Sequence, residues 1–108
     1  MPTSLPLPPL LTEQLDALRL LCLRYGVERL DVFGSASSGA FDPVHSDLDF
    51  IVQMQGERDP GFALRFCQFA EDLEGLYQRP VDLLTERMIR NPYFKAEVER
   101  TRRQLVEI

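Results

Sequence analysis

The stretch Ser46-Asp47-Leu48-Asp49-Phe50-Ile51-Val52 decides how the rest of the chain is interpreted. Its acidic and apolar residues alternate, which is typical of a half-buried strand. Residues two apart in a strand project from the same face, so Asp47 and Asp49 place two carboxylates about 7 Å apart, opposite Leu48 and Phe50. Two like charges beside apolar neighbours are unfavourable unless a cation sits between them. Oxygen ligands at this spacing suit Mg²⁺, which prefers to be completed by substrate phosphates.

A second short apolar stretch, Val81-Asp82-Leu83-Leu84, carries a single charge. A carboxylate in such a strand needs either solvent or a cation. If this strand lies beside the first one, Asp82 converges with Asp47 and Asp49. Three carboxylates can hold a pair of metal ions, one that activates a nucleophile and one that bridges a triphosphate.

The opposite half of such a site is predicted at Gly34-Ser35, which follows an expected strand over residues 27–33. Gly34 lets the backbone approach a phosphate without a Cβ in the way. The backbone amides and the Ser35 hydroxyl can then donate hydrogen bonds to the phosphate oxygens. Ser37 and Ser38, in the small-residue loop that follows, are candidate weak donors to the same phosphates.

The remaining pattern predicts a small α/β (α+β) domain with helices packed on a mixed sheet. A proline-rich arm over residues 1–11 precedes a single domain over residues 12–108. The expected elements are a helix capped by Thr12 and ended by Gly26, strands over 27–33, 47–52 and 81–84, a helix that starts at Asp59-Pro60 and is broken at Pro80, a helical turn over 85–90, and a final helix that starts at Asn91-Pro92 and runs along Phe94, Val98, Thr101 and Leu105.

Several single residues receive a structural interpretation. Asp31 is expected at a solvent-facing or edge position, and Tyr93 is expected to be partly buried. The two cysteines, Cys22 and Cys67, fall at apolar positions of helices and are predicted to be buried free thiols. A basic cluster on the final helix is either a solvated face or a docking surface; it comprises Arg100, Arg102 and Arg103.

Composition limits the classes of function. A chain of 108 residues with 44% hydrophobic residues is about one domain with a real core. The net charge of −5 argues against a surface that tracks nucleic-acid phosphates, although a nucleotide held through Mg²⁺ is compatible with it. The sequence has no apolar run of about 20 residues and no signal-peptide pattern. We therefore expect a cytoplasmic protein with no membrane and no direct nucleic-acid partner.

Three of these stretches resemble the minimal nucleotidyltransferase (MNT) domain of the polymerase-β-like nucleotidyltransferase superfamily: residues 30–35, 46–52 and 81–85. The similarity covers residues 12–108 and implies the palm-like fold of that superfamily. It also implies transfer of AMP from ATP to an acceptor hydroxyl, with two Mg²⁺ ions and loss of pyrophosphate. On that pattern Gly34 and Ser35 hold the triphosphate, Asp47 and Asp49 bind the metals, and Asp82 completes the metal site and helps to activate the acceptor.

The resemblance further implies a partner. Single-domain members are commonly antitoxins that silence HEPN-domain ribonucleases by attaching AMP to a tyrosine. The sequence departs from the pattern in two ways: the loop over residues 36–39 has no Arg or Lys, and eleven residues separate Ser35 from Asp47. Two alternatives therefore stay open, namely an antitoxin that neutralises its partner by binding alone and a transferase that acts on a small molecule such as an aminoglycoside.

Overall fold

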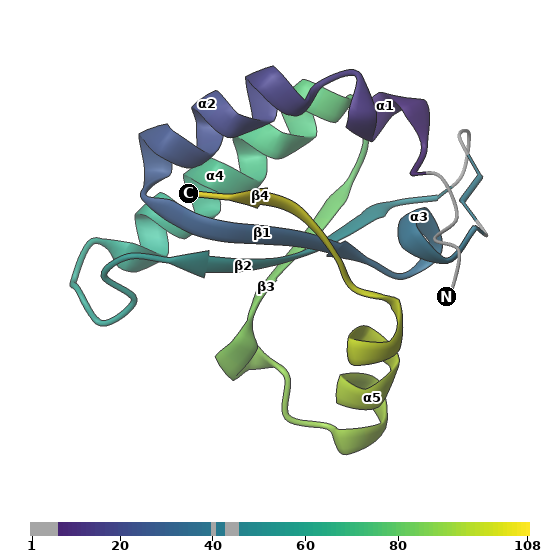
Figure 1. Cartoon of the computed structure of the whole chain (residues 1–108). Helices are drawn as coiled ribbons and strands as arrows, with labels where there is room; N and C mark the ends of the chain where they lie inside the picture. Colours follow the sequence, from purple (N-terminus) through teal and green to yellow (C-terminus); the bar gives the residue numbers. More distant parts are fainter. Residues whose placement is uncertain (1–6, 40, 43–45) are drawn as a thin grey trace.

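The computed structural model describes residues 7–39, 41–42 and 46–108. At its centre, these residues form a mixed four-stranded sheet in the order β3-β2-β1-β4 (Figure 1). The strands are β1 (Val27–Phe33), β2 (Leu48–Met54), β3 (Val81–Thr85) and β4 (Arg103–Glu107). β1 is antiparallel to both of its neighbours, β2 and β4, whereas β2 and β3 are parallel. The predicted fold class, a small mixed sheet with helices packed on it, is confirmed.

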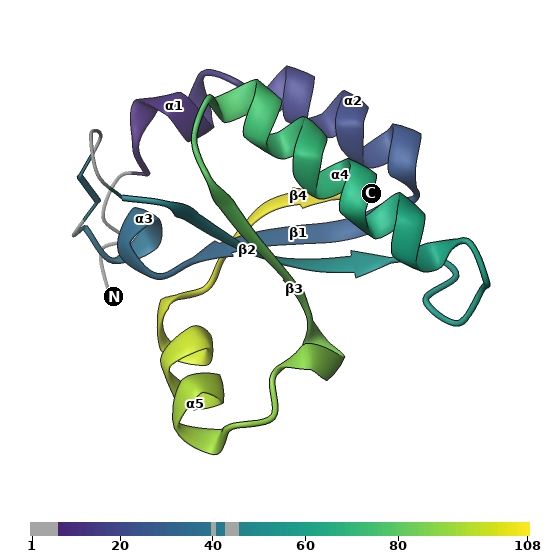
Figure 2. The same ribbon diagram turned by 180° about the vertical axis from the view of Figure 1, so that it is seen from behind.

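The helices are divided between the two faces of the sheet, as Figures 1 and 2 show from opposite sides. One face carries α1 (Pro9–Thr12), α2 (Leu15–Tyr25) and α4 (Phe62–Tyr77). The other carries α5 (Pro92–Thr101) and the 3-10 turn η1 (Glu86–Met88). The short helix α3 (Ser35–Ser38) follows β1 directly at one end of the sheet. No helix in the described part of the chain is both long and apolar enough to cross a membrane.

Strand alternation sorts the side chains into two cores. Leu30, Val32, Phe50 and Val52 are fully buried in the large core beneath α2 and α4. Their neighbours in the chain point to the other face, where Phe33 and Ile51 pack with Val98 of α5 in a second, smaller cluster. Because this small cluster joins Val98 to the two strands, it holds α5 on the sheet. Leu84 of β3 and Ile89, which follows η1, pack against it.

Two predicted helix starts are wrong by a few residues. Thr12 is the last residue of α1 and does not cap α2, which begins after Gln14 without a side-chain cap. The α4 helix begins at Phe62 instead of Asp59, because the chain around Asp59 is still a turn: the Asp59 amide donates to the Gly56 carbonyl at 3.0 Å, and the Asp59 carbonyl accepts from the Phe62 amide at 3.0 Å. The other signals hold, since Gly26 ends α2 in the left-handed conformation and the Asn91 side chain caps α5.

The largest correction concerns the C-terminal segment. The final helix ends at Thr101, and residues 103–107 form β4, which pairs with β1 and places Val106 opposite Leu30. Leu105 therefore belongs to a strand. Of the three arginines expected on one helix face, Arg100 lies in α5, Arg102 follows its last turn and Arg103 opens β4, so they share no helical surface.

Burial also differs from expectation at three positions in the helices. Leu11, assigned to the arm, is fully buried in the large core. Cys22 is buried as expected, but Cys67 is exposed, because it lies on the outer side of α4. Tyr93 is 86% exposed at the start of α5.

Candidate active site

The predicted catalytic residues meet at one end of the sheet. β1 ends where the antiparallel β2 begins, so Phe33 lies opposite Asp49 and the corner at Gly34 follows directly. β3 is parallel to β2 and pairs with it in a register that puts Asp82 opposite Asp49. Three sequence-distant segments therefore bring Gly34, Asp49 and Asp82 together because of strand direction and register.

The Asp49 carboxylate is the most perturbed acid of this site. It is half-buried, whereas Asp47 and Asp82 are exposed. Burial, followed by a hydrogen bond with Asp82 and by the charges of Asp82 and Asp47, raises the pKa of Asp49 from 3.8 to about 6. Crowded carboxylates of this kind share a proton or bind a cation in its place.

The donor set fits Mg²⁺. Hard oxygen ligands are what this ion prefers, and it needs only one or two carboxylates when phosphates complete its shell. Asp49 and Asp82 supply two, and Asp47 is near enough for its charge to act on Asp49. The described residues contain no group of three acidic, histidine or cysteine side chains that could hold a metal ion by themselves. The convergence of all three aspartates on one spot, expected from the sequence, is therefore seen only for Asp49 and Asp82.

The backbone at Gly34 is shaped around Asp49. Gly34 has φ +72° and ψ −145°, a conformation that strongly favours glycine. A Cβ added here would lie 2.6 Å from Asp49 Oδ2. The Asp49 carboxylate can therefore lie against the backbone of residue 34 only because this residue has no side chain. Ser35, the next residue, opens α3 and is partly exposed beside this contact.

The corner is held from the far side by Thr101, the last residue of α5. The Gly34 amide donates to Thr101 Oγ1 at 3.1 Å, and the Thr101 hydroxyl donates to the Glu97 carbonyl at 3.0 Å. The Ser37 hydroxyl donates to the Thr101 carbonyl, and Ser37 is buried. Ser37 is therefore occupied inside the fold, which does not suit the phosphate-donor role considered for it. Nothing in the sequence pattern pointed to Thr101, because Gly34 and Ser37 lie more than sixty residues away from it.

A cavity of about 440 Å³ opens beside the carboxylates. One side is polar and contains Gly34, Asp49 and Asp82. The remaining walls are mostly apolar and include the acidic Glu97; they are formed by Phe33, Leu83, Leu84, Phe94 and Glu97. The cavity can thus place a group of partly apolar character next to Gly34 and the two carboxylates.

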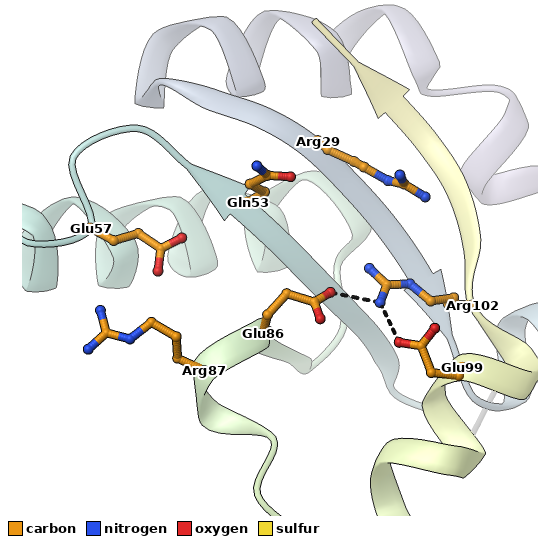
Figure 3. A pocket seen from close by; sticks show the side chains of 7 residues that line it. All are labelled: Arg29, Gln53, Glu57, Glu86, Arg87, Glu99 and Arg102. Carbon is orange, nitrogen blue, oxygen red and sulfur yellow. Dashed lines mark hydrogen bonds and ion pairs between the residues drawn. The ribbon is translucent and has the colours of Figure 1, made fainter.

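A second pocket, of about 550 Å³, is lined by charged residues and by Gln53 (Figure 3). Arg102 is its most connected side chain, with Nη1 2.7 Å from Glu86 and 2.9 Å from Glu99. Its Nε donates to Asp31 at 2.9 Å, and Arg29 donates to the same carboxylate at 3.0 and 3.1 Å. Asp31 is fully buried, so the predicted solvent-facing or edge position is wrong. Its strand also carries Glu28 and Arg29, and Arg29 bonds Asp31 from two positions earlier, whereas the second partner, Arg102, lies 71 residues away in the sequence.

Comparisons with known proteins agree with this geometry. Residues 16–105 match the family described as nucleotidyltransferase domain. The chain is 32% identical over 81 residues to a Methanocaldococcus jannaschii protein that is provisionally named a protein adenylyltransferase, covering 75% of this chain and 79% of that one. This match spans the greater part of both proteins, so it compares whole domains.

Solved structures show the same fold. A structure provisionally described as a minimal nucleotidyltransferase superimposes with a TM-score of 0.67 at 31% identity, covering 86% of this chain and 90% of that one. A Shewanella oneidensis complex of a tri-AMPylated HEPN toxin with its MNT antitoxin gives 0.62 at 18% identity, covering 91% of this chain and 73% of that one. At that identity the second likeness concerns the fold alone. Together with the family match, these findings establish that the chain belongs to the nucleotidyltransferase domain family and is a nucleotidyltransferase of the minimal type.

Proposed function

We propose that this nucleotidyltransferase transfers AMP from ATP to a hydroxyl of a partner protein, a HEPN-domain toxin, and so acts as its antitoxin. The observation that carries the proposal is the meeting of Gly34, Asp49 and Asp82 at one end of the sheet. A phosphate-binding corner and a pair of acids in contact with it are the two halves that nucleotidyl transfer requires.

Each half has a distinct task. The amide and hydroxyl of Ser35 donate to the triphosphate oxygens, and the glycine before it leaves room for them. Asp47, Asp49 and Asp82 would hold Mg²⁺, which we propose binds as two ions; when bound, these ions would neutralise phosphate charge and lower the pKa of the attacking hydroxyl. The acceptor oxygen forms a bond to the α-phosphorus, the bond to the bridging oxygen breaks, and pyrophosphate leaves. The proton of the hydroxyl is proposed to go to Asp82, a role that the exposure of Asp82 on β3 supports.

The acceptor class is supported by the relatives and by the cavity. The M. jannaschii relative is provisionally a protein adenylyltransferase, and the S. oneidensis complex contains an AMPylated HEPN toxin. The apolar walls beside Asp82, formed in part by Leu84 and Phe94, suit the ring of a tyrosine better than a polycationic sugar. A tyrosine hydroxyl of the toxin is therefore the proposed acceptor.

The test is intact-mass measurement of a HEPN-domain ribonuclease from the same genome after incubation with this protein, ATP and Mg²⁺. We expect a mass gain of one or more AMP units, loss of the gain with Asp49→Asn or Asp82→Asn, and loss on chelation with EDTA. Glu71→Gln, an exposed acid on α4, serves as the matched control and should leave the gain intact. No AMP adduct with the wild-type protein would contradict the proposal.

A second candidate is an antitoxin that acts by binding alone. Two observations favour it. The loop over residues 36–39 has no basic residue, and within the described residues Asp47 does not form a three-ligand group with Asp49 and Asp82. On this hypothesis Asp49→Asn and Asp82→Asn neutralise the toxin as well as the wild type does. Toxin activity in cells that co-express each variant separates the two candidates.

A further inference from the structure

Local hydrogen bonds hold only the carbonyl side of the Gly34 corner, where the Gly34 carbonyl accepts the Ser37 and Ser38 amides, both at 3.1 Å. Glycine populates many backbone conformations, and Gly34 is the hinge between β1 and a helix of only four residues. The value of ψ at Gly34 determines where the Ser35 amide points. A corner that binds phosphate well therefore also needs a group that fixes the amide side of Gly34 before the nucleotide arrives.

Thr101 meets this need from the other end of the chain. It is 6% exposed, and its hydroxyl accepts the Gly34 amide while donating to the Glu97 carbonyl, so its orientation is determined by two bonds. Its carbonyl also accepts the Ser37 hydroxyl, which ties the following turn to the same point. The Gly34 amide is consequently used inside the protein, and the donors left for phosphate are those of Ser35.

Thr101 is itself held in place by its neighbour in sequence. Arg102 is bonded to buried Asp31 of β1, which fastens the C-terminal end of α5 to the sheet. It is also bonded to Glu86 of η1 and to Glu99 of α5 itself, as Figure 3 shows. Val98, fully buried in the small core, adds an apolar anchor one turn earlier. The support behind Gly34 is therefore rigid.

We infer that Thr101 is a positioning residue for the nucleotide: through its hydroxyl it fixes the Gly34 backbone and thereby aims the Ser35 donors at the triphosphate. It touches no substrate itself. The inference rests on the proposed function, because it assumes that ATP binds at this corner. It predicts that removing the Thr101 hydroxyl weakens nucleotide binding by more than the loss of folding stability alone would.

The test measures binding of a non-hydrolysable ATP analogue with Mg²⁺ to the full chain by calorimetry. Thr101→Val keeps the shape and removes the hydroxyl, and we expect about tenfold weaker binding, as for loss of one buried hydrogen-bond partner. Thr101→Ser restores the hydroxyl and should bind within about twofold of wild type. The matched control is Thr85→Val, a buried threonine on β3, which should bind like wild type. Equal affinity of Thr101→Val and wild type would overturn the inference.

A second measurement covers the case in which Thr101→Val does not fold. In the wild-type protein the Gly34 amide should be strongly protected from hydrogen exchange, because it is bonded to a buried hydroxyl; exchange at the rate of a free loop amide would overturn the inference. If the wild-type protein does not bind the analogue at all, the proposed function fails, whereas the exchange measurement still reports on Thr101 and Gly34.

Discussion

Replacing Asp31 with asparagine should lower the free energy of unfolding by about 3 kcal/mol. The Asp31 side chain is fully buried and accepts three hydrogen bonds, two from Arg29 and one from Arg102. Asparagine has the same shape but no charge, and its amide group presents N–H donors to guanidinium donors. Removing one partner of a buried ion pair typically costs about 3–5 kcal/mol of stability. This is roughly 3–5 times what an exposed ion pair contributes at most.

The low end of that range applies for a structural reason. Arg29 is 41% exposed and can be solvated after the change, and Arg102 keeps Glu86 and Glu99. A loss of about 3 kcal/mol corresponds to a fall of roughly 12 °C in the melting midpoint of a chain of this size. Urea unfolding followed by circular dichroism gives the free energy directly.

The control is an ion pair on the surface. Glu97 and Arg100 are 56% and 65% exposed, so Glu97→Gln should cost less than about 1 kcal/mol. If Asp31→Asn costs no more than Glu97→Gln, the claim that Asp31 fastens β1 to the end of α5 is wrong. A cost well above 5 kcal/mol would also contradict the argument, because it would mean that the two arginines find no other solvation.

Three further predictions follow from single contacts. Gly34→Ala should cost about 1–3 kcal/mol and abolish binding of an ATP analogue, because it strains the positive φ and puts a Cβ against Asp49, whereas Gly61→Ala has open space and should be nearly neutral in urea titrations. In the absence of Mg²⁺, Asp49→Asn should melt a few degrees higher than wild type at pH 8 but not at pH 4: the folded-state pKa of Asp49 is raised to about 6, so the wild type loses stability as pH rises from about 4 to 6. An equal difference at both pH values would refute this. A thiol reagent should modify exposed Cys67 in the native protein, and Cys22 only after unfolding, because burial raises the Cys22 pKa to about 12; mass spectrometry would count the labels.

Much of the fold follows from local pattern. The sequence predicts strands over 27–33 and 47–52, and the alternation in the second strand correctly puts Leu48, Phe50 and Val52 together on one buried face. The lone Asp82 in an apolar run predicts its meeting with Asp49, since only a neighbouring strand brings it there. These features depend on spacing, which the sequence contains.

The features that could not be predicted depend on distant partners. Residues 101–107 continue the three-to-four spacing of α5 through Leu105, so the period favours a helix; the strand forms because β1 offers an unpaired edge there. Asp31 is buried because Arg102, seventy-one residues later, arrives beside it. Thr101 contributes to the Gly34 corner for the same reason, across a separation of 67 residues.

This separation has a consequence for biosynthesis. Every acid of the candidate site and the whole phosphate corner are translated before residue 83, yet the groups that hold the corner, Thr101 and Arg102, emerge from the ribosome later. Until β4 pairs with β1, a nascent chain carries the carboxylates without a fixed place for the nucleotide. If ATP binds at this corner as proposed, a chain holds it well only after β4 has paired with β1, so nucleotide affinity reports whether the sheet is complete.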